Sequence, residues 1–173
     1  MELNDANDSL VRSNRFDSCD SGINLWRWCH QPELNVRNQI LSNQFLNTRG
    51  SALLIRSNTA SNVISGNIIN GCGAAGILLD GSKQTLAGNT ISGAAKEGIL
   101  VSGSDCEVRD NRCHDNSASK PGGYDGIRIT GARNCVTGNV VGSKTGAAPH
   151  RRPISDEGKD NRVEAVAVGG SPP

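Results

Sequence analysis

The chain has 173 residues and a net charge of +1 at pH 7, so it can form one domain with a sizeable core. The near-neutral charge gives no general electrostatic case for binding nucleic acid or an anionic membrane surface. No apolar run approaches membrane-spanning length, so no membrane insertion is expected, and residues 1–4 show no secretory signal. The chain begins abruptly in a repeat with nothing to cover its first turn, so we expect either a piece of a longer protein or a partner that covers the first turn.

A repeat with a period near 22 residues runs along the chain, and one asparagine marks each turn. These asparagines are Asn14, Asn43, Asn67, Asn89, Asn111 and Asn139. Alternate apolar residues mark one strand of each turn, at Ile23/Leu25, Leu53/Ile55, Ile77/Leu79, Ile99/Val101 and Ile127/Ile129. Apolar residues also stand before each asparagine, from Val11 to Val136, and after it, from Phe16 to Val141. Alternate strand residues point to opposite faces, so these sets can face inward and stack on their equivalents one turn away.

A period near 22 is too short for two packed helices, and it fits a coil of short strands with sharp corners. The pattern therefore predicts an all-β parallel β-helix, a solenoid of about six turns with three short sheets. Asn67, Asn89 and Asn111 should stack at one corner and hydrogen-bond along the axis. Glycine at the corners permits backbone angles that other residues resist.

In chain order, residues 1–22 form an irregular first turn, and a strand at 23–26 leads into an insertion at 27–34. Residues 35–112 are the most regular part. Two further insertions, at 116–125 and 144–153, interrupt successive turns at the same place, so they should lie side by side. Val163 fits a partial seventh turn. We expect one β-helix domain over residues 1–165 and a flexible tail over residues 166–173.

The two later insertions collect most of the chemistry, because loops on a rigid scaffold usually carry binding groups. The cations suit an acidic sugar or a phosphate. The candidates for binding are Lys120, Arg128, His150, Arg151 and Arg152. In an enzyme, His114 or Tyr124 would move a proton and Asp125 would orient it. The alternative is a solvated pair of polar loops.

The first insertion contains two aromatic candidates. Trp26 and Trp28 could form a platform on which a sugar ring stacks. The alternative is a loop folded over the side or the N-terminal end of the solenoid.

The six cysteines are interpreted as free thiols that behave as small apolar residues. Cys113 takes an inward position, and Cys29 lies in a loop. Cys19 and Cys72 hold the same place two turns apart, too far for a disulfide. There is no C-x-x-C pair, and the outward strand positions are not an acidic cluster, so neither a zinc nor a calcium site is predicted. No metal and no cofactor is expected.

The residue between the two inward positions of the main strand should face outward. It is leucine in three consecutive turns, at Leu54, Leu78 and Leu100. An apolar row of this kind often marks a contact surface, so a homo-oligomer, most plausibly a trimer, is expected through it. The competing explanation is that the Trp26–Trp28 insertion or a preceding segment covers the row.

The phrases G-N-I-I-N-G, G-N-T-I-S-G, D-N-R-C-H-D-N-S and Y-D-G-I-R-I-T-G-A-R-N-C-V-T-G-N resemble right-handed parallel β-helix repeat proteins of the pectate-lyase-like superfamily. The resemblance implies a right-handed coil and an extracellular or cell-surface location. It also implies a carbohydrate-related role, either binding a polysaccharide or processing it as a lyase, C5-epimerase or glycoside hydrolase. Tyr124-Asp125-Gly126 loosely resembles an epimerase motif. The alternative is a non-catalytic scaffold, such as part of a surface protein or tail fibre, and whether the chain is an enzyme stays open.

Overall fold

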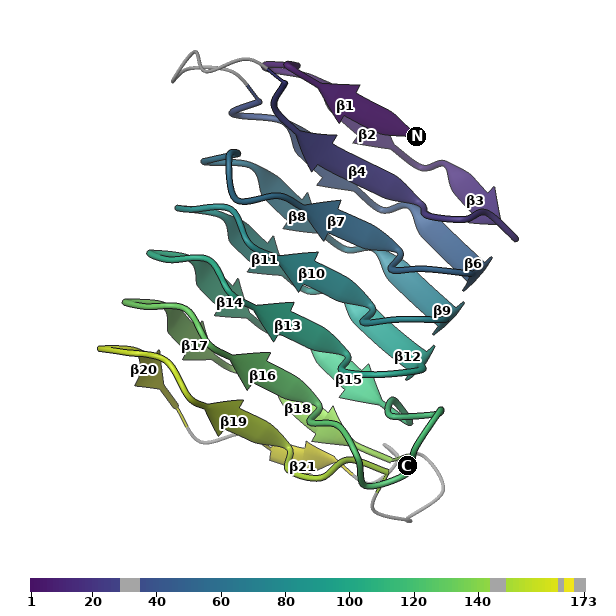
Figure 1. Ribbon diagram of the computed structural model, residues 1–173, viewed down its shortest axis with the longest axis vertical. Coiled ribbons are helices and arrows are strands. Elements are labelled where there is room, and N and C mark those ends of the chain that lie inside the picture. Colours follow the sequence, from purple (N-terminus) through teal and green to yellow (C-terminus); the bar gives the residue numbers. More distant parts are fainter. Residues whose placement is uncertain (29–34, 144–148, 165–166, 170–173) are drawn as a thin grey trace.

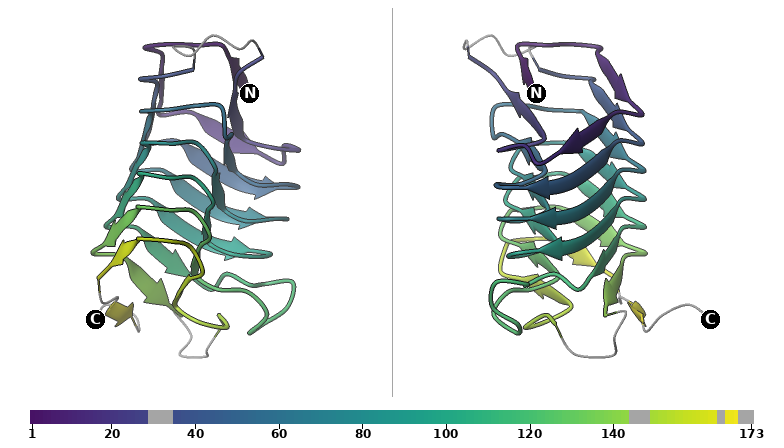
Figure 2. Two further views of the ribbon diagram at one scale, coloured as in Figure 1. Left: turned by 60° about the vertical axis from the view of Figure 1, so that its left-hand side comes forward. Right: turned by 90° about the vertical axis from the view of Figure 1, so that its right-hand side faces the viewer.

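The computed structural model describes residues 1–28, 35–143, 149–164 and 167–169, and over these residues three parallel sheets wrap around one core (Figure 1). Each sheet takes one strand from every turn, so neighbours in a sheet come from successive turns. The first and last turns lie at opposite ends of the coil, as both side views show (Figure 2). No helix of the described residues is long and apolar enough to span a membrane. The predicted all-β solenoid is confirmed.

The three sheets are named A, B and C in the order in which the chain enters them. Sheet A contains β1 (Glu2–Asn4), β4 (Ile23–Trp26), β7 (Leu53–Ile55), β10 (Ile77–Leu79), β13 (Ile99–Val101), β16 (Ile127–Ile129) and β19 (Ile154–Asp156). Sheet B contains β2 (Leu10–Arg12), β5 (Gln39–Leu41), β8 (Val63–Ser65), β11 (Thr85–Ala87), β14 (Glu107–Arg109), β17 (Cys135–Thr137) and β20 (Arg162–Val163). Sheet C contains β3 (Arg15–Asp17), β6 (Gln44–Thr48), β9 (Ile68–Cys72), β12 (Thr90–Ala94), β15 (Arg112–His114), β18 (Val140–Gly142) and β21 (Ala167–Gly169).

The core is built from the inward residues that the repeat identifies. Ile77 and Leu79 of β10 are fully buried, and they pair in register with Ile99 and Val101 of β13. In β7, β10 and β13 of sheet A, the first and third residues are buried and the middle residue points outward. Cys113 occupies one of these inward positions in sheet C, as expected, and is fully buried.

The predicted asparagine stack is confirmed. The backbone N–H and the Nδ2 of Asn67 both donate to Oδ1 of Asn89, each at 2.9 Å. Asn89 repeats the pattern on Asn111, at 3.0 Å from its backbone N–H and 2.9 Å from Nδ2. The residues just before the stack, Gly66 and Gly88, have φ of 64° and 63°, which is left-handed backbone that favours glycine.

A second ladder, which the sequence reasoning missed, stands at another corner. Its members lie five residues before the asparagines of the first ladder, so they recur with the same period as those asparagines. The N–H of Asn62 donates to Oε1 of Gln84 at 2.9 Å, and the N–H of Cys106 donates to Oδ1 of Asn134 at 2.9 Å. Cys106 interrupts the row of amides, and its thiol donates to the carbonyl of Gly81 at 3.2 Å instead.

The last turn is only partly described. Val163 pairs with Val136, so the partial seventh turn is confirmed. Beyond it, β21 pairs with β18 in sheet C. The expected bounds, a domain over residues 1–165 and a tail over residues 166–173, stay a prediction.

The thiols and the leucine row lie where the repeat predicts. Cys19, Cys72, Cys106, Cys113 and Cys135 are all free, while Cys29 lies outside the described residues. Leu54, Leu78 and Leu100 stand in one row across β7, β10 and β13, and each is half-buried. Whether this row mediates self-association stays a prediction.

Candidate functional site

A pocket lies on the outward face of sheet A near its N-terminal end. It has a volume of about 430 Å³ and is lined by Glu2, Asn24, Trp26, Arg56, Ser57 and Asn58. Two neighbouring strands create it. Leu25 pairs with Ile55, so Trp26 and Arg56, the next residues in each turn, come to lie side by side on the outward face.

Hydrogen bonds hold the walls of this pocket in place. Arg56 begins a tight turn, because its carbonyl accepts from the backbone N–H of Thr59 at 3.1 Å and from its Oγ1 at 2.8 Å. Asn58, within that turn, accepts from the backbone N–H of Arg27 at 3.2 Å and donates back to the Arg27 carbonyl. The side chain of Asn35 donates to the carbonyl of Trp26. The segment that carries the tryptophan is therefore fixed on both sides.

The second tryptophan stands beside the pocket and is open to solvent. Trp28 is 73% exposed, and its ring meets that of Trp26 edge to face, with centroids 5.2 Å apart and an interplanar angle of 79°. Its backbone N–H is held by Oδ1 of Asn4 at 3.1 Å and Oδ1 of Asp5 at 2.9 Å. An exposed aromatic ring on a tethered backbone is a preorganised contact.

Two polar groups of the pocket are poised for a ligand. The indole Nε1 of Trp26 is buried and has no hydrogen-bond partner among the described residues. The guanidinium of Arg56 donates through Nε to Oδ1 of Asn24 at 3.1 Å. No ion pair of Arg56 occurs among the residues that the structure describes. Buried donors are normally hydrogen-bonded, so the unpaired Nε1 of Trp26 is the donor that a ligand would satisfy.

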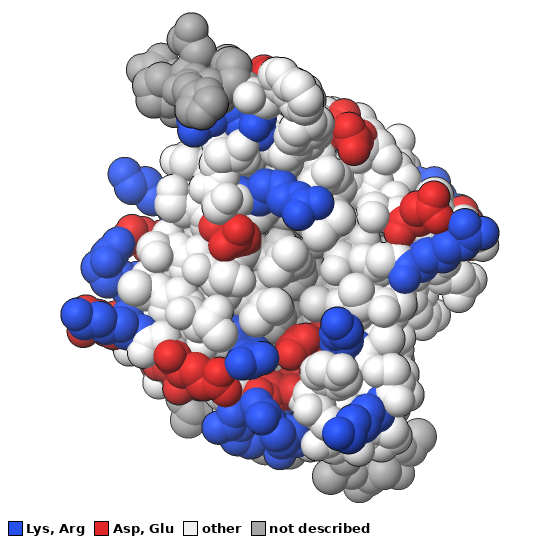
Figure 3. All heavy atoms as spheres, in the orientation of Figure 1, with Lys and Arg blue, Asp and Glu red and all other residues white. Residues whose placement is uncertain are grey.

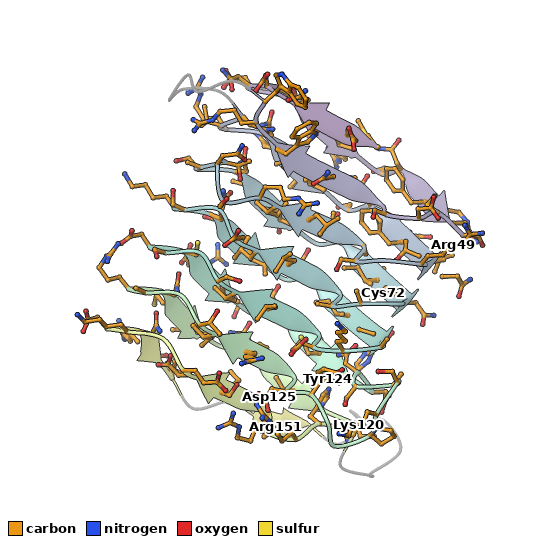
Figure 4. All side chains as sticks on the ribbon, viewed as in Figure 1. Arg49, Cys72, Lys120, Tyr124, Asp125 and Arg151 are labelled. Carbon is orange, nitrogen blue, oxygen red and sulfur yellow. The ribbon has the colours of Figure 1, made fainter. Side chains whose placement is uncertain are left out.

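The two later insertions meet at the other end of sheet A, as predicted. The N–H of Gly122 donates to the carbonyl of Pro149 at 2.9 Å, and the N–H of Arg151 donates to that of Tyr124 at 2.7 Å. Lys120, Tyr124, Asp125 and Arg151 lie together in this region (Figure 4). Residues 144–148 of the second insertion are outside the described part of the chain.

Asp125 is the centre of this cluster and is fully buried. Its carboxylate accepts two hydrogen bonds from Arg151, at 2.9 and 2.5 Å, and one from Ser155 Oγ at 2.6 Å. Arg152 approaches it at 3.4 Å. Burial alone raises the pKa of Asp125, but the hydrogen bonds from Arg151, Ser155 and Arg152 outweigh it and hold the pKa well below its usual range. The carboxylate therefore stays ionised and cannot donate a proton near neutral pH.

The arginines expected to bind an acidic ligand have carboxylate partners within the protein. Arg128 donates through Nη2 to Glu157 at 2.7 Å, and Arg152 donates to the same carboxylate at 3.0 Å. Hydrogen bonds from Arg128 lower the pKa of Glu157. Acidic and basic side chains alternate over β16 and β19 at this end of sheet A (Figure 3). Their charges are largely compensated before any ligand arrives.

The other predicted site residues are distributed around the same loops. His114 ends β15 and is half-buried, as are Tyr124 and His150, whereas Lys120 is exposed. Burial lowers the pKa of His150, Asp115 raises it, and His114 lowers it further. The hydrogen bonds described for Asp125 come from arginines and Ser155 rather than from Tyr124. The structure thus brings these residues into one region, and their catalytic roles stay a prediction.

The sequence reasoning named both tryptophans as site residues, but it missed the other residues that line the pocket: Glu2, Asn24, Arg56, Ser57 and Asn58. A signal for Arg56 was present. It stands three residues after Leu53, as Trp26 stands three residues after Ile23, so the strand repeat places both in one row.

Residues 1–163 match the model of the family NosD, described as periplasmic copper-binding protein. No curated protein and no solved structure matches the chain.

The donor set of the described residues does not fit a copper site. Copper in proteins is bound by clustered thiolate, thioether or imidazole groups. Among residues 1–28, 35–143 and 149–164, no group of three or more His, Cys, Asp or Glu side chains could hold a metal ion. Burial raises the pKa of Cys106 to about 11 and also raises the pKa of Cys72 and Cys113, so the thiolate forms of these residues are disfavoured in the metal-free protein.

The match extends over nearly the whole chain, and the three parallel sheets show the stacked-turn architecture that the repeat requires. The chain therefore belongs to the NosD family of right-handed parallel β-helix proteins.

Proposed function

We propose that this protein binds a polysaccharide on the outward face of sheet A and that the pocket at Trp26 is the anchoring site. The observation that carries the proposal is the pairing of a polar pocket with an exposed, tethered tryptophan. The pocket volume of about 430 Å³ lies in the range of small-molecule sites, about 300–1,000 Å³, and suits one or two sugar units.

The lining matches the chemistry of a sugar. Aromatic rings pack on the apolar faces of sugar rings, and their polar handles hydrogen-bond at the rim. Trp28 offers an open ring face, while Trp26 offers a buried N–H without a partner among the described residues. Asn24, Ser57 and Glu2 supply donors and acceptors that hydroxyl groups can use.

A longer glycan has a surface to follow beyond the pocket. Leu54, Leu78 and Leu100 continue along sheet A, one per turn, towards the loop cluster at Asp125. The middle of this face, over β7, β10 and β13, carries fewer charged side chains than the end over β16 and β19 (Figure 3). A chain crossing the strands would pass from the tryptophans over the leucine row, with the loops as a wall.

The geometry supports binding better than catalysis. Asp125, the carboxylate expected to orient a proton transfer, is buried and committed to Arg151 and Ser155. A location outside the cytoplasm accords with this role and with the periplasmic description of the family.

The test is glycan-array and affinity-electrophoresis binding of the protein and its Trp28→Ala variant. Trp28 is 73% exposed, so its removal should leave the fold intact while weakening binding at least about tenfold. Ile68→Ala is the matched control, because Ile68 is also exposed, at 48%, but lies on sheet C. Equal affinity of Trp28→Ala and the parent protein for a bound glycan would contradict the proposal.

A further inference from the structure

The arginines on the face of sheet A differ in whether they are already neutralised. Arg128, Arg151 and Arg152 each form an ion pair with Asp125 or Glu157. Arg56 forms no ion pair among the described residues, although Glu2 lines the same pocket. Binding an acidic ligand at the first three would require breaking existing pairs, whereas Arg56 has no carboxylate within ion-pair distance among the described residues.

Arg56 is also oriented for recognition. Its single described side-chain hydrogen bond runs from Nε to Asn24 Oδ1, at 3.1 Å, and this bond ties the guanidinium to the neighbouring strand β4. No hydrogen bond among the described residues uses either Nη group, so both can donate to a ligand. The paired Nη groups of a guanidinium match the two oxygens of a carboxylate, which is the fork geometry that favours arginine over lysine at such sites.

The surroundings favour one class of acid. The pocket places Trp26 beside Arg56, with the side chains of Asn24, Ser57 and Glu2 in the same lining. A ligand that satisfies the whole lining needs an apolar ring face, several hydroxyl groups and one carboxylate. A uronic acid residue within a glycan has all three.

We infer that the pocket selects a uronic acid residue, with its carboxylate on Arg56 and its ring against the tryptophans. This inference rests on the proposed polysaccharide binding and assigns acid recognition to Arg56 instead of the loop arginines. Glu2 would accept hydrogen bonds from sugar hydroxyls and disfavour ligands with a second nearby charge.

The experiment compares two uronate polymers, polygalacturonate and alginate, with methyl-esterified polygalacturonate, in which the carboxylates are neutral. Isothermal titration calorimetry is run on the parent protein, Arg56→Gln and Arg49→Gln. Arg49→Gln is the matched control, because Arg49 is an exposed, ion-paired arginine just past β6, away from the pocket (Figure 4). The parent should bind at least one uronate polymer about ten- to a hundredfold more tightly than the ester.

Arg56→Gln should lose that preference and Arg49→Gln should keep it. Equal binding of the acid and ester forms, or a preference that survives in Arg56→Gln, would overturn the inference. If Trp28→Ala still weakened binding in that case, the proposed polysaccharide binding would stand. If neither uronate bound but a neutral glycan bound through Trp28, only the acid recognition would fail. No binding to any glycan would overturn both.

Discussion

The asparagine ladder should tolerate a break at its end far better than a break in its middle, and Asn89→Leu tests this. Asn89 is fully buried, and its Oδ1 accepts from both the backbone N–H and the Nδ2 of Asn67. Its Nδ2 donates to the carbonyl of Ile64 at 3.0 Å and to Oδ1 of Asn111 at 2.9 Å. Leucine has a similar volume, so the change removes hydrogen bonds without opening a large cavity.

The main cost comes from one group. After the substitution, the buried N–H of Asn67 has lost its acceptor, whereas the Nδ2 of Asn67 keeps the carbonyl of Ile40. An unsatisfied buried donor costs about 1–3 kcal/mol, and the other lost bonds add to it, so the free energy of unfolding should fall by on the order of 3 kcal/mol. For a chain of this size, that loss lowers the melting temperature by about 6–12 °C.

Far-ultraviolet circular dichroism during thermal and urea unfolding measures the effect. Asn14→Leu is the control, because Asn14 is exposed at the first turn and no described backbone donor depends on its side-chain oxygen. Its cost should stay below about 1 kcal/mol. Equal losses for the two variants would refute the reasoning that burial of the unsatisfied donor sets the cost.

Three further predictions concern acid stability, thiols and assembly. The lowered pKa of Asp125 means that its pairing stabilises the fold above about pH 4, where an unfolded aspartate is ionised, and is lost as the pH falls through the folded pKa. Between pH 5 and pH 3, the urea midpoint of unfolding should therefore fall less for Asp125→Asn than for the parent protein. An equal fall in both proteins would contradict a stabilising role for the ionised Asp125. The buried thiol of Cys106, whose pKa is raised to about 11, should resist alkylation at pH 8 in the folded protein, while half-exposed Cys135 should react. Peptide mass spectrometry measures the labelling of each cysteine, and early labelling of Cys106 would contradict its burial. The leucine row can serve either the proposed glycan path or the expected trimer, because a trimer interface would cover it. If it mediates the trimer, light scattering should give a trimer mass for the parent and a monomer mass for Leu78→Asp. A monodisperse monomer for both would rule the trimer out and leave the row open to a glycan.

The fold was predictable because its determinants repeat at a nearly constant spacing. Alternate apolar residues such as Ile77 and Leu79 return one turn later as Ile99 and Val101, and only a coil in register buries all of them. The second ladder followed the same period, but its members change identity at Gln84 and Cys106, so it escaped notice. The placement of the two later insertions side by side was predictable for the same reason of register.

The amino-acid sequence by itself therefore determined the coil, the inward residues and the stacked asparagines, because each depends on local alternation and a period. Only the tertiary structure decided the candidate site. Trp26 and Arg56 meet because β4 pairs with β7 across the long first insertion, and the hydrogen bond from Arg56 to Asn24 exists only in that register. It also decided that Arg151 forms an ion pair with buried Asp125, because the two residues meet only when two loops from successive turns pack together. The repeat pattern of the sequence does not reveal such a contact.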